Sequence, residues 1–290
     1  MTGQDGTRKP RVHLVAVVGG GDSILLSHFV DHYRALGVES FYLIRHAEST
    51  DEPAYEEIAH YARVAGVALH HTHVGPWDDD LHGRLMTAAM DEHPDDWYIL
   101  ADLDEFHVYD RPLADLVALC EREGKQRVCG CFVDRMGPDG ILAPLTAGPL
   151  WPQYPLGGAI TSRLLTAPTL KVGLSLGRLR TGGGHHGVPG KTGLPREQSY
   201  IQVHHFKWTE SVFARMRRRE ERYQSGTWPL VYPSVLDEAR RLLRYLRRHR
   251  GRIDVADPRL LVGPCDEGYD GFQRWPEVAE DAQRWESFLA

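Results

Sequence analysis

The sequence predicts an α/β protein whose mixed, mainly parallel sheet carries helices on both faces and is followed by a C-terminal helical extension. Two observations carry this prediction. Apolar runs of strand length alternate with amphipathic segments of helical period through the N-terminal part, which is typical of a parallel sheet. From residue 209 onward the pattern is helical and rich in arginine. We therefore expect a disordered tail over 1–10, an α/β domain over 11–208 and a helical extension over 209–290.

The first strand, expected over 12–18, is an almost unbroken apolar run rich in valine, as in a strand that is buried on both faces. Glycines end it, and the helix over 24–36 repeats apolar residues at three- and four-residue spacings. Pro53 opens the next helix, a position that suits proline. The same patterns give strands over 41–44, 67–70 and 97–101, and helices over 53–64 and 81–92.

Beyond the fourth strand the alternation is less regular. A Gly/Pro-rich region over 137–193 follows a helix and a strand. Long stretches of this kind inside a compact domain are usually functional loops, and the part over 177–193 is the candidate lid. The elements expected here are strands over 127–133, 160–165, 169–174 and 200–203, and helices over 112–123, 211–225, 234–250 and 276–289.

Composition excludes several classes of function. The 290 residues are 42% hydrophobic and 26% charged, as in ordinary globular proteins, and the net charge of −6 argues against generic binding to nucleic acid. No apolar run is long enough to span a bilayer and the polar start is unlike a signal peptide, so we expect a cytoplasmic protein. Any membrane contact would be peripheral, through the arginine runs over 215–222 and 240–252.

One stretch carries the chemistry. Residues 97–106 read WYILADLDEF, an apolar run of strand length followed by three carboxylates within four positions. Ligands of open α/β sheets bind outside the carboxyl ends of the strands. Regular strand geometry would put Asp102 and Asp104 on one face, where a cation between them would relieve their repulsion. Carboxylates suit Mg²⁺ or Mn²⁺, which bridge to substrate phosphates, so the stretch predicts a metal–diphosphate site.

Three segments together resemble the family 2-type bacterial glycosyltransferases with a D-x-D-E-F signature, near the family 92 galactosyltransferase-like group. They are LGV and FYLI over 36–44, the WYILADLDEF stretch, and VHHFKW over 203–208. The resemblance covers roughly residues 11–225. It implies a GT-A-like fold, a nucleotide-diphosphate sugar donor (a UDP-sugar is favoured) and Mn²⁺ or Mg²⁺. Where the family commonly carries an Asn-Glu pair after the first strand, this chain has Gly20, Gly21 and Asp22.

These considerations give candidate residues for each role. The metal ligands would be Asp102 and Asp104 with one histidine from each of the pairs His185/His186 and His204/His205. The donor would contact Gly20, Gly21, Asp22, Arg45, Asp102, Lys207 and Trp208. Asp134, at the end of a strand on the same edge, is the candidate base, with Glu105 and Asp139 next in line. The acceptor would meet Trp151, Gln153 and Tyr154.

Two other functions fit the same residues. One is a metal-dependent phosphohydrolase acting on a nucleotide or phosphosugar, which would turn over without an acceptor. The other is a non-catalytic nucleotide-binding module, suggested by the altered segment over 19–22. The acceptor itself is open among a glycan, a lipid-linked molecule and a small molecule, and so is the oligomeric state.

Overall fold

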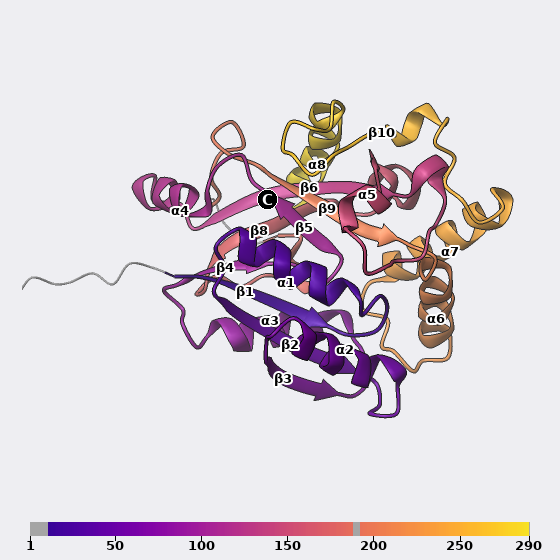
Figure 1. The fold of residues 1–290 in the computed structure, drawn as a ribbon, viewed down its shortest axis with the longest axis horizontal. Helices are drawn as coiled ribbons and strands as arrows, with labels where there is room; N and C mark the ends of the chain where they lie inside the picture. Colours follow the sequence, from indigo (N-terminus) through magenta and orange to yellow (C-terminus); the bar gives the residue numbers. More distant parts are fainter. Residues whose placement is uncertain (1–10, 188–191, 290) are drawn as a thin grey trace, which may run out of the picture.

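The computed structural model describes residues 11–187 and 192–289 (Figure 1). The expected tail over 1–10, and residues 188–191 of the candidate lid, lie outside the described residues. The strands are β1 (Val12–Val18), β2 (Ser40–Ala47), β3 (Leu69–Val74), β4 (Trp97–Leu100), β5 (Glu105–Val108), β6 (Arg127–Met136), β7 (Leu156–Gly158), β8 (Leu170–Leu176), β9 (Ile201–Trp208) and β10 (Gly263–Pro264).

Eight α-helices lie within the described residues: α1 (Leu25–Ala35), α2 (Pro53–Val64), α3 (Asp79–Met90), α4 (Leu113–Arg122), α5 (Leu150–Gln153), α6 (Val212–Gln224), α7 (Pro233–Arg248) and α8 (Trp275–Leu289). Short 3₁₀ turns occur at η1 (Pro138–Gly140), η3 (Gly183–His185) and η4 (Pro258–Leu260), and η2 (Thr161–Leu165) is a π-helix. In the part of the chain described, no helix combines the length and the apolar character needed to cross a membrane.

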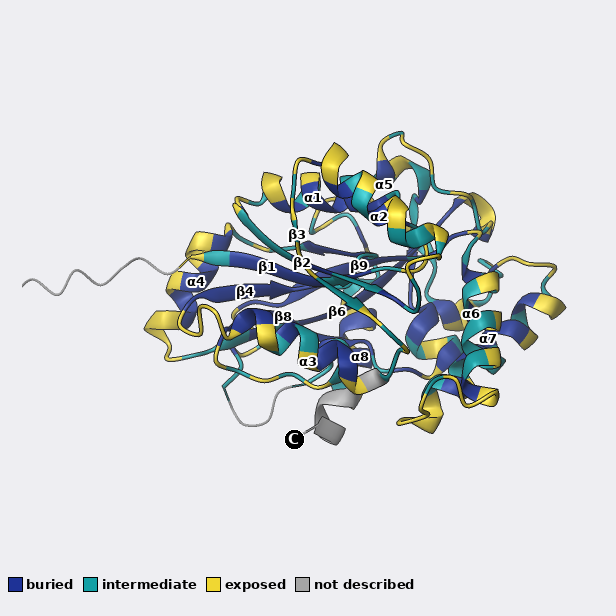
Figure 2. Ribbon diagram, turned by 90° about the horizontal axis from the view of Figure 1, so that it is seen from below, coloured by how far each residue is buried: buried dark blue, intermediate teal, exposed yellow. Residues whose placement is uncertain are grey.

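The strands form one mixed sheet in the order β10-β7-β6-β8-β4-β1-β2-β3, with β9 beside β6 and β5 beside β9. Strands β1, β2, β3 and β4 pair in parallel, and β8 is antiparallel to both β4 and β6, so β6 and its parallel neighbour β9 run the same way as β1. Helices α1 and α2 cover one face, and α3 and α8 the other (Figure 2). The predicted mixed α/β architecture with helices on both faces is confirmed.

Alternation along β1 explains its unbroken apolar sequence. Leu14 and Ala16 pack in the core cluster that contains Phe29 of α1, whereas Val15 packs with Met86 of α3 on the opposite face. Because both faces are covered, successive residues of the strand are all apolar. At the C-terminal end, α6 and α7 pack around Trp208 of β9 in a further apolar cluster, so the extension shares its core with the sheet.

Two local predictions are wrong. The segment predicted as a strand over 160–165 is the π-helix η2, and its three apolar residues, interrupted by Thr161, Ser162 and Arg163, carry no clear period. Strand β5, which begins at Glu105, was not expected; it pairs with β9 in antiparallel register, with Glu105 opposite His205. This strand makes the chain reverse directly after Asp104.

Candidate active site

The polar residues of interest gather at one edge of the sheet. Strands β1, β2, β4, β6 and β9 run in the same direction, so their carboxyl ends meet there, and in Figure 1 the arrows of β1 and β9 point toward α6 and α7. The segments that leave these ends carry Asp22, Glu48, Asp102 and Asp104. This is the edge at which open α/β sheets bind ligands.

The two aspartates do not share a face. Strand β4 ends at Leu100, and a turn closed by the Glu105 amide on the Asp102 carbonyl oxygen (2.9 Å) replaces the extended geometry. The prediction that strand alternation would place Asp102 and Asp104 together is therefore wrong. Asp102 points toward α3 and β8, whereas Asp104 points toward β9 and α6, as their contacts show.

Asp102 lies among three basic side chains. The His82 Nε2 donates to its Oδ1 at 2.9 Å, the Lys171 ammonium donates to its Oδ2 at 3.2 Å, and the His185 Nε2 lies 3.6 Å from Oδ1. One ligand atom each from His82, Asp102 and His185 lies within 4.8 Å of the others. Burial would raise the pKa of Asp102, but Lys171 and the histidines hold it well below its ordinary value. The carboxylate is therefore charged.

Lys171 compensates the negative charge of Asp102 from the buried side of the site. It sits in β8, 1% exposed, with Nζ 2.7 Å from Oε1 of Glu105 and 2.8 Å from the carbonyl oxygen of Gly184. Burial would lower the pKa of Lys171, yet its two carboxylate neighbours raise it, so the ammonium keeps its proton. Burial also raises the pKa of Glu105 well above its ordinary value, against the opposing effect of Lys171. Glu105, also 1% exposed, supports Asp102 rather than facing solvent.

His185 has the properties of a metal ligand. It is fully buried, its φ of 42° lies in the left-handed region, and neither ring nitrogen has a hydrogen-bond partner. Burial lowers the pKa of His185 to about 3, so the imidazole is neutral and keeps a lone pair. An unpartnered buried nitrogen beside a charged carboxylate is costly unless a further group binds there. Two imidazoles and a carboxylate fit Mn²⁺ better than Mg²⁺, which prefers oxygen ligands.

A small residue brings the two histidines together. Gly83 follows His82 in α3, and a Cβ built on it would lie 3.2 Å from the carbonyl oxygen of Thr181. The absence of a side chain therefore lets α3 approach the loop that leads into η3. As a result, the rings of His82 and His185 stack with centroids 5.6 Å apart.

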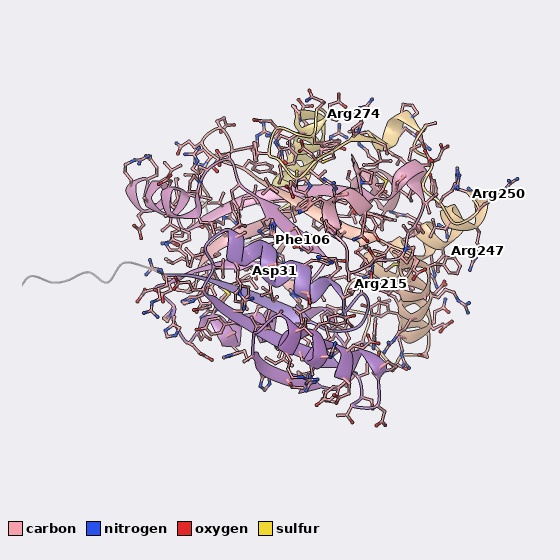
Figure 3. The ribbon with its side chains drawn as sticks, in the orientation of Figure 1. Asp31, Phe106, Arg215, Arg247, Arg250 and Arg274 are labelled. Carbon is pink, nitrogen blue, oxygen red and sulfur yellow. The ribbon has the colours of Figure 1, made fainter. Side chains whose placement is uncertain are left out.

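Asp104 faces a different set of groups. Its Oδ2 lies 3.8 Å from Nε2 of His205 and 3.7 Å from a terminal nitrogen of Arg215 in α6. Figure 3 places Arg215 where α6 meets the ends of the strands. The Arg215 guanidinium also lies 3.9 Å from Asp22, whose Oδ2 accepts hydrogen bonds from Thr209 at 2.7 Å and Ser211 at 2.9 Å. The turn after β1, the turn after β4 and the start of α6 thus converge.

Asp134 is not an open base. It is fully buried, and its two oxygens accept four hydrogen bonds: from the amide and hydroxyl of Thr161, from Nδ1 of His205 and from the indole of Trp208. Burial would raise its pKa, but these donors hold it below the usual value. The carboxylate has no free face for an acceptor hydroxyl, which corrects the expectation that it is the base. Trp208, fully buried in this contact, belongs to the core instead of the expected donor surface.

In each histidine pair, one residue faces the carboxylates and the other contacts the scaffold. The residues that face the carboxylates are His185 and His205. His186 donates from Nδ1 to the carbonyl oxygen of Leu170 at 2.8 Å, and burial lowers its pKa to about 3. His204 lies 3.2 Å from the buried guanidinium of Arg135 and bonds Gln202. His186 and His204 therefore contact the surrounding scaffold and not the carboxylates.

Several other candidates lie in scaffold contacts. Arg45 donates to the carbonyl oxygen of Tyr55 at 2.9 Å and stacks on its ring. Gln153 holds the loop over 146–149 through four hydrogen bonds, and Tyr154, fully buried, donates to the carbonyl oxygen of Ala143. Trp151 packs edge-on against Phe106, Phe206 and His204. These contacts do not assemble a common acceptor surface.

Burial and Arg219 lower the pKa of Lys207, whose carbonyl oxygen accepts a hydrogen bond from Arg215.

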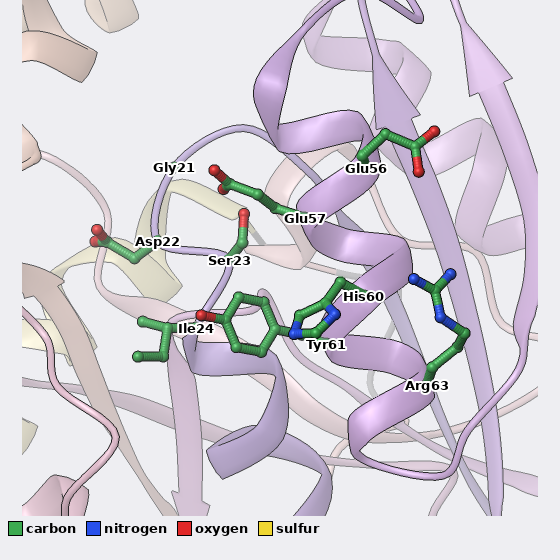
Figure 4. Close-up of a pocket in the computed structure, with 9 residues that line it drawn as sticks. All are labelled: Gly21, Asp22, Ser23, Ile24, Glu56, Glu57, His60, Tyr61 and Arg63. Carbon is green, nitrogen blue, oxygen red and sulfur yellow. The ribbon is translucent and has the colours of Figure 1, made fainter.

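A pocket of about 600 Å³ opens beside the turn after β1 (Figure 4). The segment that leads into α1 contributes Gly21, Asp22, Ser23 and Ile24 to its lining, and α2 contributes Glu56, Glu57, His60, Tyr61 and Arg63. The turn itself needs glycine, because Gly20 and Gly21 have φ values of 45° and 123°. Gly19 is equally constrained, since a Cβ there would lie 2.0 Å from the carbonyl oxygen of His46.

Sequence reasoning missed His82, Lys171 and Arg215. Lys171 did leave a signal, because it is a lone charge in the apolar run over 170–176, and a buried lysine needs a charged partner. His82 and Arg215 lie on helices whose patterns resemble ordinary half-exposed helices. Nothing in their local sequence separates them from neighbouring polar residues.

No protein-family model and no curated protein matches the chain. Among solved structures, a putative glucose-1-phosphate thymidylyltransferase from Bacillus anthracis is 10% identical, with 48% of this chain and 62% of that chain covered and a TM-score of 0.29. S. aureus TarS (1–349) is 10% identical, with 83% of this chain and 73% of that chain covered and a TM-score of 0.33. An apo UDP-glucose pyrophosphorylase is 10% identical, with 72% of this chain and 99% of that chain covered and a TM-score of 0.29. The chain spans less than two thirds of the thymidylyltransferase. Likenesses this weak carry no argument about function, which must rest on the site.

Proposed function

We propose that this chain is a metal-dependent glycosyltransferase with a GT-A-like fold, moving a sugar from a nucleotide-diphosphate sugar to an acceptor hydroxyl. The observation that carries the proposal is the unpartnered, fully buried His185 beside the charged Asp102, with His82 completing a three-residue ligand set. This set lies at the carboxyl end of β4, between the parallel strands and the reversed strand β8. A UDP-sugar and Mn²⁺ are the donor and cofactor that we favour.

The residues around Asp102 are fixed before any ligand arrives. Lys171, which is itself paired with Glu105, holds the Asp102 carboxylate from the buried side, and the short η3 turn carries His185. A divalent cation bound by His82, Asp102 and His185 would neutralise the diphosphate leaving group. To bind the cation through Nε2, His82 would give up the proton that it donates to Asp102, while Lys171 and the η3 turn keep Asp102 and His185 in place.

Proton transfer is assigned to the other side of the turn. Asp134 accepts the Nδ1 proton of His205 at 3.0 Å, which leaves Nε2 directed toward Asp104. A carboxylate that fixes the tautomer of an imidazole in this way prepares the free nitrogen to take a proton. We therefore propose His205 as the base toward the acceptor hydroxyl, with Asp134 as the positioning residue.

The test is nucleotide binding followed by turnover. Calorimetric titration of UDP and GDP with Mn²⁺ and with a chelator should show tight binding in metal only. Donor turnover should then be slow in water and rise strongly with a suitable acceptor from a panel of sugars, lipid-linked glycans and small alcohols. Equal affinity in metal and chelator would remove the metal from the proposal, and turnover that no acceptor accelerates would indicate a phosphohydrolase.

A further inference from the structure

Arg215 is the cation that the C-terminal extension brings to the site. Its guanidinium lies between two carboxylates, 3.7 Å from Asp104 and 3.9 Å from Asp22. Both separations exceed hydrogen-bond length, so neither carboxylate is bonded to it in the bidentate manner that arginine favours. One terminal nitrogen of Arg215 donates a hydrogen bond to the carbonyl oxygen of Lys207, at 2.9 Å.

A second observation is the unsatisfied Nε of Arg215. This atom is buried and has no hydrogen-bond partner, although the side chain as a whole is 25% exposed. It lies against the turn after β1: a Cβ on Gly21 would come 3.2 Å from Cδ of Arg215 and 3.8 Å from Nε. A buried guanidinium N–H without an acceptor is costly, and an incoming anion would satisfy it.

Helix α6 is anchored over this edge of the sheet by two further arginines. Arg218 and Arg222 pair with opposite oxygens of Glu48, at 2.8 Å and 3.0 Å, and Arg218 also pairs with Glu52. Glu48 follows β2 directly. Because these pairs fix the helix against the ends of the strands, Arg215 is held in place rather than reaching the site from a free loop.

We propose that Arg215 is a donor-binding residue that takes the β-phosphate of the nucleotide sugar, exchanging its two loose carboxylate contacts for bidentate phosphate contacts. This inference rests on the proposed function, because it assumes a nucleoside diphosphate at this edge. Guanidinium and phosphate match in geometry, and a planar donor fork gains more from two phosphate oxygens than from carboxylates beyond hydrogen-bond reach. The extension is then part of the donor site.

The experiment measures the affinity of the full chain for nucleotides in Mn²⁺ by calorimetry. A panel of nucleoside diphosphates first identifies the base that the wild-type protein binds, and the matching monophosphate, which lacks the β-phosphate, serves as the second ligand. Arg215→Met should weaken diphosphate binding by about 10- to 100-fold and leave monophosphate binding unchanged. Arg215→Lys, which keeps the charge without the fork, should fall between the two. Arg217→Met is the matched control, since Arg217 lies on the exposed side of the same helix and pairs with Glu221.

The outcomes separate the two proposals. If the wild-type protein binds no nucleoside diphosphate, the proposed function is overturned and this inference with it. If the wild type binds and Arg215→Met binds the diphosphate equally well, only the inference is overturned. Equal losses for diphosphate and monophosphate would also contradict it, because Arg215 would then act on the nucleotide as a whole or on the fold. Arg215→Lys keeps the test valid if the methionine variant does not fold.

Discussion

The Nδ1 of His205 lies 3.0 Å from a carboxylate oxygen of Asp134. The ring of Phe132 stacks on the imidazole of His205, with the two ring centroids 4.1 Å apart. The pair of Asp134 and His205 joins β6 to β9, where the two residues are also register partners in the parallel ladder. Asp134 is saturated with donors, whereas Nε2 of His205 is directed at the more open Asp104. Chemistry at this point would therefore act through the imidazole.

Asp134→Asn tests this relationship. An amide in place of the carboxylate would turn its NH₂ group toward at least one of the donors from Thr161, His205 and Trp208, leaving buried donors face to face. We expect a loss of about 1–3 kcal/mol in the free energy of unfolding, measured in urea, together with slower transfer by about 10²-fold or more. An unchanged unfolding free energy with a lost transfer rate would instead indicate that Asp134 itself is the base.

Lys171→Met tests the buried charge network. The substitution keeps the length of the side chain but leaves the carboxylates of Asp102 and Glu105 without their cation. Breaking a buried pair from one side costs about 3–5 kcal/mol. Thermal and urea unfolding should show this loss, and the double variant with Glu105→Gln should recover part of it because one carboxylate is gone. Additive losses in the double variant would show that Lys171 and Glu105 are not coupled.

Local patterns predicted most of the elements. Helix α2 occupies the predicted 53–64, since proline at its start and an apolar repeat are readable in a short window. Strand β5 was missed because its burial comes from pairing with β9, whose residues lie about a hundred positions away in the sequence. The prediction over 160–165 was wrong because the two leucines of 161–165 follow three polar residues, a pattern without a clear period.

The site was predicted less completely than the fold. Asp102 was expected at the end of a strand, and it lies there, but its partner His82 comes from a helix and Lys171 from a strand 69 residues further along. Such contacts depend on the order in which the strands lie in the sheet and on the connections between them. The turn that separates Asp102 from Asp104 depends on the pairing of β5 as well, so the spacing of two residues alone gave the wrong face.

Metal binding should depend on the two histidines beside Asp102. In the wild-type protein, Mn²⁺ should raise the thermal unfolding midpoint and a chelator should reverse the rise, because a ligand that binds only the native state stabilises it. His82→Ala and His185→Ala should each abolish this response. His70→Ala is the control, since His70 is exposed and pairs with Glu92 on another part of the surface. A response that survives in His185→Ala but disappears in His205→Ala would place the cation beside Asp104 instead.

His32 should make the protein less stable in mild acid. Its Nε2 donates to the carbonyl oxygen of His107 at 2.9 Å while its ring packs against Phe106 and Trp151, and burial lowers its pKa to about 4. The unfolded chain takes up a proton near pH 6.5, whereas the folded protein does so only near its lowered pKa, so stability falls as the pH drops between these values.

His32→Gln keeps a donor for the His107 carbonyl oxygen but does not titrate. Urea unfolding at pH 8, 6 and 5 should show that the unfolding free energy of the variant rises relative to that of the wild type as the pH falls. The relative rise is at most about 1.4 kcal/mol per pH unit below 6.5. The comparison at pH 8, where the imidazole is neutral in both states, gives the cost of the changed packing alone. If the two stability curves stay parallel from pH 8 to pH 5, His32 is protonated in the folded protein as readily as in the unfolded chain, and its burial carries no penalty.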